Sequence, residues 1–344
     1  GLPRPNRSEI DIDSSGGKLD YPELADLSPS TSPNPQPYNI VWLVAESWRA
    51  DSLNPRVMPN THTFAINNLW FQEHYSGGNG TRMGMFTQFY GIYGSYWFDM
   101  LQTRTPPVLM NYLQQQGYQF KAFTSSAFTY PEFDKTIFSA LPQESLVAYS
   151  EGHGWQRDQK NTTDMISFIE SASEPFFTFM FFESSHANYY FPDEDIITSD
   201  YLEDFNYLTT DIGDDINRIH NRYRNATHHL DRQFARVFDA LEQNGLMNNT
   251  IVIVTGDHGE EFMENGRWGH NSTFSQQQIR VPLLLHIPNE GAQRIEKMTS
   301  HLDLPATVLS VLHAGLPEAQ FSFGMNLLDP AYKRDYTVVS DWHG

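Results

Sequence analysis

Five short apolar runs, rich in β-branched and aromatic residues, alternate along the chain with segments of helical periodicity. Apolar runs of this length, with no polar residue at every second position, are typical of strands buried on both faces. Strands that alternate with helices form a mostly parallel sheet covered by helices on both faces. We therefore expect an α/β fold with functional residues at the carboxyl ends of the strands. The runs span residues 39–45, 120–125, 176–184, 250–259 and 281–288.

Three segments between these runs have helical signals. The first begins at Pro106 and stops at Gly117, and the second, residues 214–244, repeats apolar side chains every three or four positions. The third spans residues 303–315. The first 37 residues are rich in Ser, Pro, Asp and Gly and have no periodicity, which predicts a linker or a surface-hugging arm. Residues 38–344 are then expected to form a single α/β domain.

Charge and composition exclude several classes of function. The chain has 22 Lys and Arg against 42 Asp and Glu, a net charge of −20, which argues against a nucleic-acid binder. The same charge disfavours electrostatic docking onto anionic lipid. Cysteine is absent, which excludes disulfides, a thiolate zinc site and a cysteine nucleophile.

Polar, metal-capable side chains follow four of the expected strands. Glu46 follows the first, His186 the third, Asp257 and His258 the apolar part of the fourth, and His286 the apolar part ("VPLLL") of the fifth. In a parallel sheet these groups would share one edge. The alternative for Asp257 is a loop residue that caps a helix beginning at "GEEF". We interpret His286 as structural; His228 and His229, in the middle of a helix, are interpreted as surface groups.

Residues 76–84, "SGGNGTRMG", place four glycines around Thr81 and Arg82. Such a stretch suits either a surface turn or a nucleophile presented to a phosphate or sulfate ester. We expect it to open the helix that runs through "MGMFTQFYG", where backbone amides favour an anion.

Four ordered motifs, "VAES", "GNGTRMG", "TGDHGEEF" and "RWGHN", together resemble the sulfatase-like branch of the alkaline phosphatase superfamily over residues 38–330. This branch includes lipoteichoic acid synthases and phosphoethanolamine transferases. The resemblance implies an alkaline-phosphatase/sulfatase-like fold. It also implies a site for one divalent cation, Mn²⁺ or Mg²⁺ with Zn²⁺ as an alternative, held by Glu46, Thr81, Asp257 and His258.

The resemblance further implies that Thr81 is a nucleophile that becomes transiently phosphorylated, and that His186 and His270 lie on the substrate side. Either histidine could protonate the leaving alkoxide, because imidazole titrates near neutrality. Arg82 is an additional candidate for contacting phosphate. The sulfatases themselves carry Cys or Ser in C/S-x-P-x-R, whereas this chain has "TRMGM", which argues against sulfate-ester hydrolysis.

The resemblance thus points to a phosphoesterase or phospho-group transferase acting on a phospholipid or lipid-linked phosphate. The expected setting is the periplasmic domain of a Gram-negative inner-membrane protein. The chain begins without Met and stops at "SDWHG", so we expect a piece of a longer protein, with its C-terminus truncated and its transmembrane helices missing from the N-terminal side. The alternative is a catalytically silent domain that binds lipopolysaccharide or cardiolipin and regulates envelope assembly.

Overall fold

An eight-stranded sheet with β1 (Asn39–Ala45) near its middle organises the protein. The computed structural model describes residues 19–29, 34–203, 205–206, 208 and 210–344. β1 pairs in parallel with β5 (Phe176–Phe182) on one side and with β6 (Thr250–Gly256) on the other, and every residue of these strands is buried. The sequence prediction of strands without polar alternation is therefore confirmed at the centre of the sheet.

The remaining strands extend the sheet in both directions, in the order β10-β2-β9-β6-β1-β5-β3-β4. β9 is antiparallel to both of its neighbours, and the other pairings are parallel. The expected mostly parallel sheet is thus confirmed. The outer strands are β2 (Leu69–Tyr75), β3 (Gln119–Thr124), β4 (Leu146–Ala148), β9 (Leu283–His286) and β10 (Gln293–Ser300).

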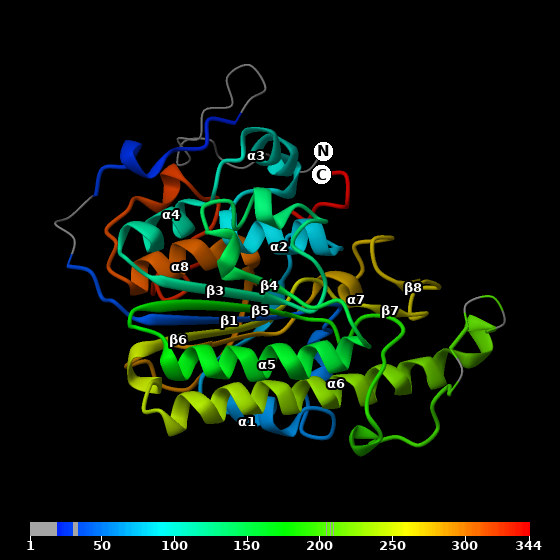
Figure 1. Ribbon diagram of the computed structural model, residues 1–344. Helices are drawn as coiled ribbons and strands as arrows, with labels where there is room; N and C mark the ends of the chain where they lie inside the picture. The colour runs from blue at the N-terminus through cyan, green and yellow to red at the C-terminus, as the bar shows by residue number, and fades with distance from the viewer. Residues whose placement is uncertain (1–18, 30–33, 204, 207, 209) are drawn as a thin grey trace.

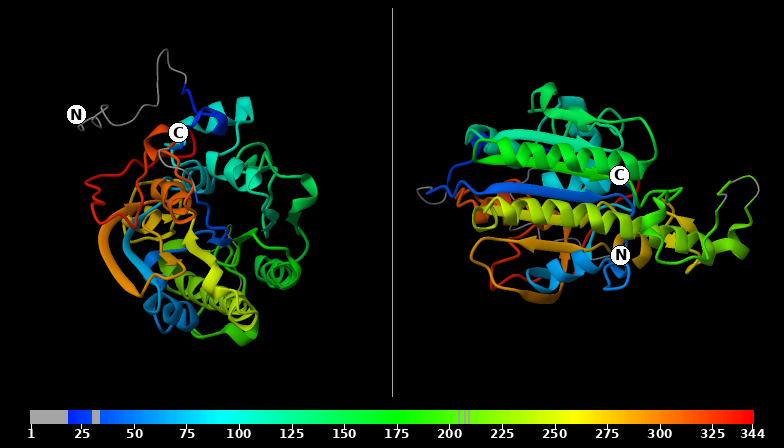
Figure 2. Two further views of the ribbon diagram at one scale, coloured as in Figure 1. Left: turned by 90° about the vertical axis from the view of Figure 1, so that its left-hand side faces the viewer. Right: turned by 60° about the horizontal axis from the view of Figure 1, so that its bottom comes forward.

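Helices cover both faces of the sheet (Figure 1). The view from below in Figure 2 shows the long α6 lying along the sheet beside α5. One face carries α2 (Thr81–Tyr90), α4 (Val108–Gln115) and α8 (Leu304–Val311), and the other carries α1 (Pro59–Ile66), α5 (Gly154–Ser171) and α6 (Ile212–Gln243). Shorter elements are α3 (Trp97–Thr103), α7 (Gln276–Ile279), β7 (Glu261–Phe262) and β8 (Trp268–Gly269).

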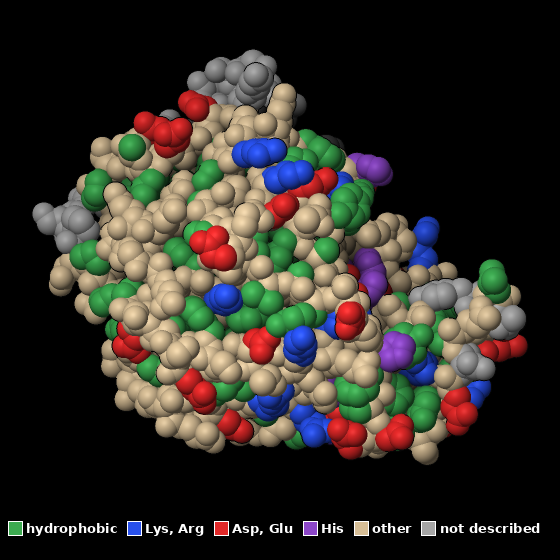
Figure 3. All heavy atoms as spheres, viewed as in Figure 1, with side chains coloured by type: hydrophobic (Ala, Val, Ile, Leu, Met, Phe, Trp, Pro, Cys, Tyr) green, Lys and Arg blue, Asp and Glu red, His purple; other side chains and the backbone are tan. Residues whose placement is uncertain are grey.

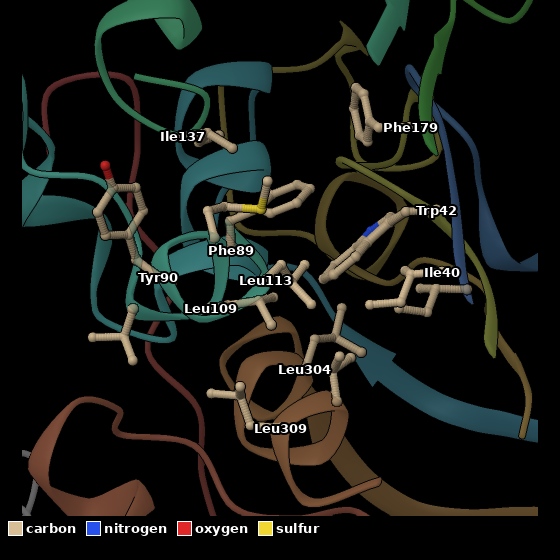
Figure 4. Packing of buried hydrophobic residues seen from close by; sticks show 14 of the residues in the cluster. Ile40, Trp42, Phe89, Tyr90, Leu109, Leu113, Ile137, Phe179, Leu304 and Leu309 are labelled. Atoms are coloured by element: carbon tan, nitrogen blue, oxygen red, sulfur yellow. The ribbon is translucent and has the colours of Figure 1, made fainter. Parts of the chain in front are cut away.

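The core between α2 and the sheet is aromatic (Figure 4). The Trp42 ring of β1 stacks on Phe89 of α2 with a centroid separation of 4.3 Å. Its indole Nε1 donates to Gln88 Oε1 at 2.9 Å, so the buried polar atom of Trp42 is satisfied. Phe89 also packs edge-on against Phe179 of β5. These contacts fix α2, and with it the position of Thr81, against the two central strands.

The opposite core is built by the apolar face of α6, with Leu230, Phe234 and Leu241 buried against the sheet. The expectation that His229 is a surface group is wrong: its side chain is fully buried, and its Nδ1 lies 2.6 Å from Asp195 Oδ2. The loop after β5 folds over this part of α6 and buries the histidine. Within the described residues, no helix has both the length and the apolar character needed to cross a bilayer.

The described part of the first 37 residues packs onto the domain. Leu19, Tyr21 and Leu27 are buried, and the Tyr21 hydroxyl accepts a hydrogen bond from Val108 N at 2.8 Å. This contact satisfies an amide at the start of α4. Residues 1–18 and 30–33 of the predicted arm lie outside the described residues.

Candidate active site

The carboxyl ends of the three central strands meet at one edge of the sheet, on the right-hand side of Figure 1 beside β7 and β8. Glu46 directly follows β1, and its N–H donates to Phe182 O of β5 at 2.9 Å. Asp257 directly follows β6, and its N–H donates to Ala45 O at 3.2 Å. In Figure 3, histidine side chains are visible on this side of the molecule. The strand ladder therefore sets the positions of both carboxylates.

Thr81 is the first residue of α2 and points into this edge. Its Oγ1 lies 3.2 Å from Glu46 Oε1 and 3.3 Å from His258 Nε2. The glycines around Thr81 allow the backbone of this segment to pack closely against Asn271 and Asp257. A Cβ on Gly80 would lie 1.8 Å from Asn271 Oδ1, and a Cβ on Gly84 would lie 2.0 Å from Asp257 O. The expected start of a helix at Thr81 is confirmed. Gly80 and Gly84 pack against other residues of the protein, Asn271 and Asp257.

Asp257 and His258 face Thr81 from the end of β6. The Asp257 Oδ1 atom accepts hydrogen bonds from Ser47 N at 3.0 Å and His258 N at 2.7 Å. Its Oδ2 atom is buried with no hydrogen-bond partner and lies 3.4 Å from His258 Nε2. Residues 261–262 form β7 rather than a helix, so the helix-capping alternative for Asp257 is wrong.

The protonation of His258 follows from its neighbours. Its Nδ1 lies 2.7 Å from Gly259 O, which can only accept, so Nδ1 carries the proton. The Nε2 lone pair then faces Thr81 Oγ1 and the unpartnered Asp257 Oδ2. An imidazole lone pair, an orphaned carboxylate oxygen, the Glu46 carboxylate and a hydroxyl form a donor set that suits a divalent cation. The residues present therefore fit the implied metal.

The acidity of these groups is consistent with a cation site. Burial raises the pKa of Glu46 to about 7. Burial, with repulsion from Glu46 second, raises the pKa of Asp257 to about 8. Burial also holds the pKa of His258 well below its usual range, so the imidazole is neutral. Two buried carboxylates that repel each other are stabilised in their charged form by a cation between them.

His270 lies beside His258, with ring centroids 4.1 Å apart. Its Nδ1 lies 2.9 Å from Glu260 Oε1, and Glu260 is buried. Burial lowers the pKa of His270, but the Glu260 carboxylate outweighs burial and raises the pKa to about 9. His270 is therefore protonated at neutral pH. Sequence reasoning overlooked Glu260, whose second oxygen accepts a hydrogen bond from the Tyr189 hydroxyl at 2.5 Å.

His186 approaches from the loop after β5. Its Nε2 lies 3.4 Å from Glu46 Oε1 and its Nδ1 lies 3.7 Å from Glu183 Oε1. Burial lowers the pKa of His186. Sequence reasoning overlooked Glu183, although the "ES" that follows β5 repeats the "ES" that follows β1. Glu183 pairs with Arg157, and the two residues line a cavity of about 150 Å³ beside His186.

Carboxylate oxygens and imidazole nitrogens within 4.8 Å of one another form two overlapping groups among the described residues. One group contains Glu46, His258 and His270, and the other contains Glu46, Glu183 and His186. Glu46 is common to both. The structure thus brings His186 and His270 to the same site as Thr81, with their ring centroids 5.9 Å apart.

Two further candidates from the sequence, Arg82 and His286, contact residues outside the Glu46 cluster. The Arg82 guanidinium packs over the Trp342 ring, 4.0 Å from its centroid, and Nη1 donates to Trp342 O at 3.0 Å. His286 lies at the opposite edge of the sheet, because β9 runs antiparallel to β6 and pairs His286 with Val252. Its ring nitrogens contact Asn68 and Met247, consistent with a structural role. The expectation that His286 shares the edge of Glu46 is therefore wrong.

Comparison with known proteins identifies the family. A family model described as Sulfatase matches residues 38–314. The chain belongs to the sulfatase family. It is 28% identical over 286 residues to the inner membrane protein YejM of Salmonella typhimurium, covering 83% of this chain and 43% of YejM. The chain spans less than half the length of the curated relatives that it matches over most of its own length.

Solved structures of other proteins share this fold. A protein of the alkaline phosphatase superfamily from Vibrio parahaemolyticus superposes with a TM-score of 0.65 at 18% identity, covering 89% of this chain and 73% of that chain. The lipoteichoic acid synthase LtaP from Listeria monocytogenes also gives a TM-score of 0.65, at 15% identity, covering 88% and 79%. The expected alkaline-phosphatase/sulfatase-like fold is confirmed.

Proposed function

We propose that this sulfatase-family domain is a metal-dependent phosphoesterase or phospho-group transferase with Thr81 as its nucleophile. One observation carries the proposal. The Thr81 hydroxyl, at the N-terminus of α2, lies within 3.3 Å of both Glu46 Oε1 and His258 Nε2. The N-terminus of a helix stabilises a nearby anionic group, which suits a phosphoryl group transferred to this hydroxyl.

Glu46, Thr81, Asp257 and His258 would hold one divalent cation. Carboxylate and hydroxyl oxygens suit Mg²⁺ or Mn²⁺, and the imidazole nitrogen also permits Zn²⁺. Such a cation, when bound, favours the alkoxide form of Thr81 and offsets negative charge on the phosphoryl oxygens.

The protein's own groups handle the protons. The Thr81 hydroxyl donates its proton toward Glu46 Oε1 as its oxygen attacks phosphorus and the ester bond to the alcohol breaks. Protonated His270 donates its Nε2 proton to the leaving oxygen, and Glu260 stabilises the charged ring beforehand. An acceptor hydroxyl then attacks the phosphothreonine and gives its proton to His270. The bond between phosphorus and Thr81 Oγ1 breaks, and Glu46 returns the proton that restores the Thr81 hydroxyl. Water as acceptor gives hydrolysis, and a second alcohol gives transfer.

The proposed substrate is a phospholipid or lipid-linked phosphate at the periplasmic face of an inner membrane. The support is the likeness to an inner membrane protein and to a lipoteichoic acid synthase. His186 lies 3.4 Å from Glu46, beside the cavity that Glu183 and Arg157 line, which supports the predicted role of His186 on the substrate side. We propose that this cavity side receives the alcohol part of the ester.

The test is hydrolysis of an aryl phosphate by the purified domain with Mg²⁺, Mn²⁺ or Zn²⁺. We expect Thr81→Ala to abolish turnover, Thr81→Ser to retain part of it, and quenched wild-type protein to carry a phosphate on Thr81. His286→Ala, a histidine change at the far edge of the sheet, is the matched control and should leave turnover unchanged. A cation-binding protein that cleaves neither aryl phosphate nor phospholipid would support the alternative of a silent, lipid-binding regulator.

A further inference from the structure

A segment distant in sequence is hydrogen-bonded to the loop that presents Thr81. We call residues 337–342 the brace segment. Ser340 N donates to Gly77 O at 2.9 Å, and Asn79 N donates to Ser340 O at 3.2 Å. These two bonds form a short parallel bridge that ends two residues before Thr81. Ser340 is buried, and a Cβ on Gly94 would lie 2.7 Å from its Cβ, so Ser340 fits closely against Gly94.

Trp342 extends this bridge to the residue after Thr81. Its carbonyl accepts from Arg82 Nη1 at 3.0 Å, and its ring lies under the guanidinium at 4.0 Å from the centroid. A cation over an indole face at this distance is attractive by about 0.5–2 kcal/mol. The brace segment therefore holds the chain on both sides of Thr81.

The other end of the brace segment is fixed to the body of the domain. Thr337 Oγ1 lies 3.0 Å from Ser300 Oγ, at the end of β10. Just before the segment, Arg334 forms an ion pair at 2.5 Å with Asp303, which is fully buried. The segment thus spans from the β10 end of the sheet to the N-terminus of α2.

The loop before Thr81 needs such support. Ordering Gly77, Gly78 and Gly80 costs more backbone entropy than ordering other residues, and the N-cap residue Gly80 provides no side-chain cap for α2. We propose that Trp342 is a positioning residue, which acts through Arg82 and the Ser340 bridge to hold the Thr81 hydroxyl against Glu46 and His258. This inference rests on the proposed function only in taking Thr81 as the nucleophile.

The kinetic test compares Trp342→Ala, Trp342→Leu and Trp342→Phe, with Tyr336→Ala as a matched aromatic deletion at an exposed site just before the brace segment. A nucleophile displaced by about 1 Å can lose about 100-fold in rate. We expect kcat for an aryl phosphate to fall by about 10- to 100-fold in the Ala and Leu variants with KM unchanged. Trp342→Phe keeps an aromatic face and should recover most of kcat. Full activity in Trp342→Ala would overturn the proposal.

A second measurement does not need turnover. Amide hydrogen exchange of residues 77–82 should accelerate in Trp342→Ala and Trp342→Leu, while exchange of β1 stays at the wild-type rate. An unchanged exchange rate of residues 77–82 would overturn the proposed positioning role of Trp342, even if kcat fell. A wild-type protein without turnover would overturn the proposed function alone, and the exchange result would still decide the role of Trp342.

Discussion

At the scale of single residues, the site contains buried carboxyl groups whose charged form is disfavoured by burial. Asp257 is fully buried with one oxygen lacking a hydrogen-bond partner, and Glu46 is buried beside it. Without a cation, both carboxyls have raised pKa values, whereas His270 is held protonated by Glu260. The arrangement of these side chains therefore favours binding of a divalent cation, which would stabilise both carboxylates in their charged form.

The first consequence is a pH-dependent cation affinity. Glu46 and Asp257, with pKa values of about 7 and 8 in the metal-free protein, must lose their protons when a cation binds. Lowering the pH from 8 to 6 should therefore weaken Mn²⁺ binding by about tenfold or more per unit. Isothermal titration calorimetry in buffers of different ionisation enthalpy should also detect proton release. A pH-independent affinity would contradict this assignment.

The second consequence concerns stability. Burial raises the pKa of Asp257 in the folded protein above its value in the unfolded chain. Ionisation of Asp257 therefore lowers the free energy of unfolding of the metal-free protein. This loss is complete above the folded-state pKa of about 8 and absent below the unfolded-state pKa. In chelator at pH 9, Asp257→Asn should raise the free energy of unfolding by about 1–3 kcal/mol. The same variant should lose stabilisation by added Mn²⁺. Urea denaturation checks both effects, with the exposed Asp335→Asn as control.

At the scale of secondary-structure elements, the site depends on how closely α2 approaches the end of β6. Gly84, one turn into α2, lies against the Asp257 carbonyl, and the Ser76 hydroxyl donates to that same carbonyl at 2.5 Å. The packing of Trp42 on Phe89 holds α2 from its other end. The distance between Thr81 and its partners is thus set by helix packing.

Gly84→Ala tests this dependence. The added Cβ would lie 2.0 Å from backbone oxygen, so α2 must shift away from β6. We expect a loss of about 1–3 kcal/mol in the free energy of unfolding and a large loss of cation affinity. Gly291→Ala, where an added Cβ meets nothing within 4 Å, is the matched control and should change neither quantity. An unchanged melting temperature and cation affinity in Gly84→Ala would show that α2 can move freely.

The sequence predicted those strands and helices that are buried enough to show a continuous or periodic run of apolar residues. The central strands are apolar throughout, and the residues that follow them are the site, so Glu46, Asp257 and His258 could be found from pattern and resemblance together. β10 reads "QRIEKMTS" and only its last two residues are buried, so no apolar run reveals it. The direction of β9 is set by its neighbours, and the contact between Arg82 and Trp342 joins residues 260 positions apart. Neither leaves a local signal.

At the scale of the whole molecule, the proposed phosphate site belongs to a strongly acidic protein. The net charge is −20, and acidic side chains are spread widely over the face in Figure 3. In the proposed reaction, an incoming phosphate would meet a helix N-terminus and a protonated histidine at the site. Local groups must therefore overcome a repulsive long-range field.

This field should be visible in binding measurements. We expect the domain to sediment with neither duplex DNA nor vesicles of anionic phospholipid at an ionic strength of about 0.15 M, because it offers few cations to replace the released counterions. Raising the salt concentration should speed hydrolysis of a dianionic aryl phosphate at low substrate by screening the repulsion. Tight binding to anionic vesicles that is lost at high salt would contradict this prediction and would indicate a local basic surface despite the negative net charge.

The reversed direction of β9 has a consequence for how such a site can diversify. β6 ends and β9 begins at the same edge, so residues 257–282 leave the sheet and re-enter it without crossing to the far side. A parallel strand at this place would have required a long crossover connection. Instead, one excursion carries Asp257, His258, Glu260 and His270. It packs against the loop before Thr81, where Asn271 N donates to Asn79 O at 2.9 Å. Because both ends of this excursion are anchored at one edge, a change in its length between β7 and α7 leaves the pairing of β6 with β9 in register.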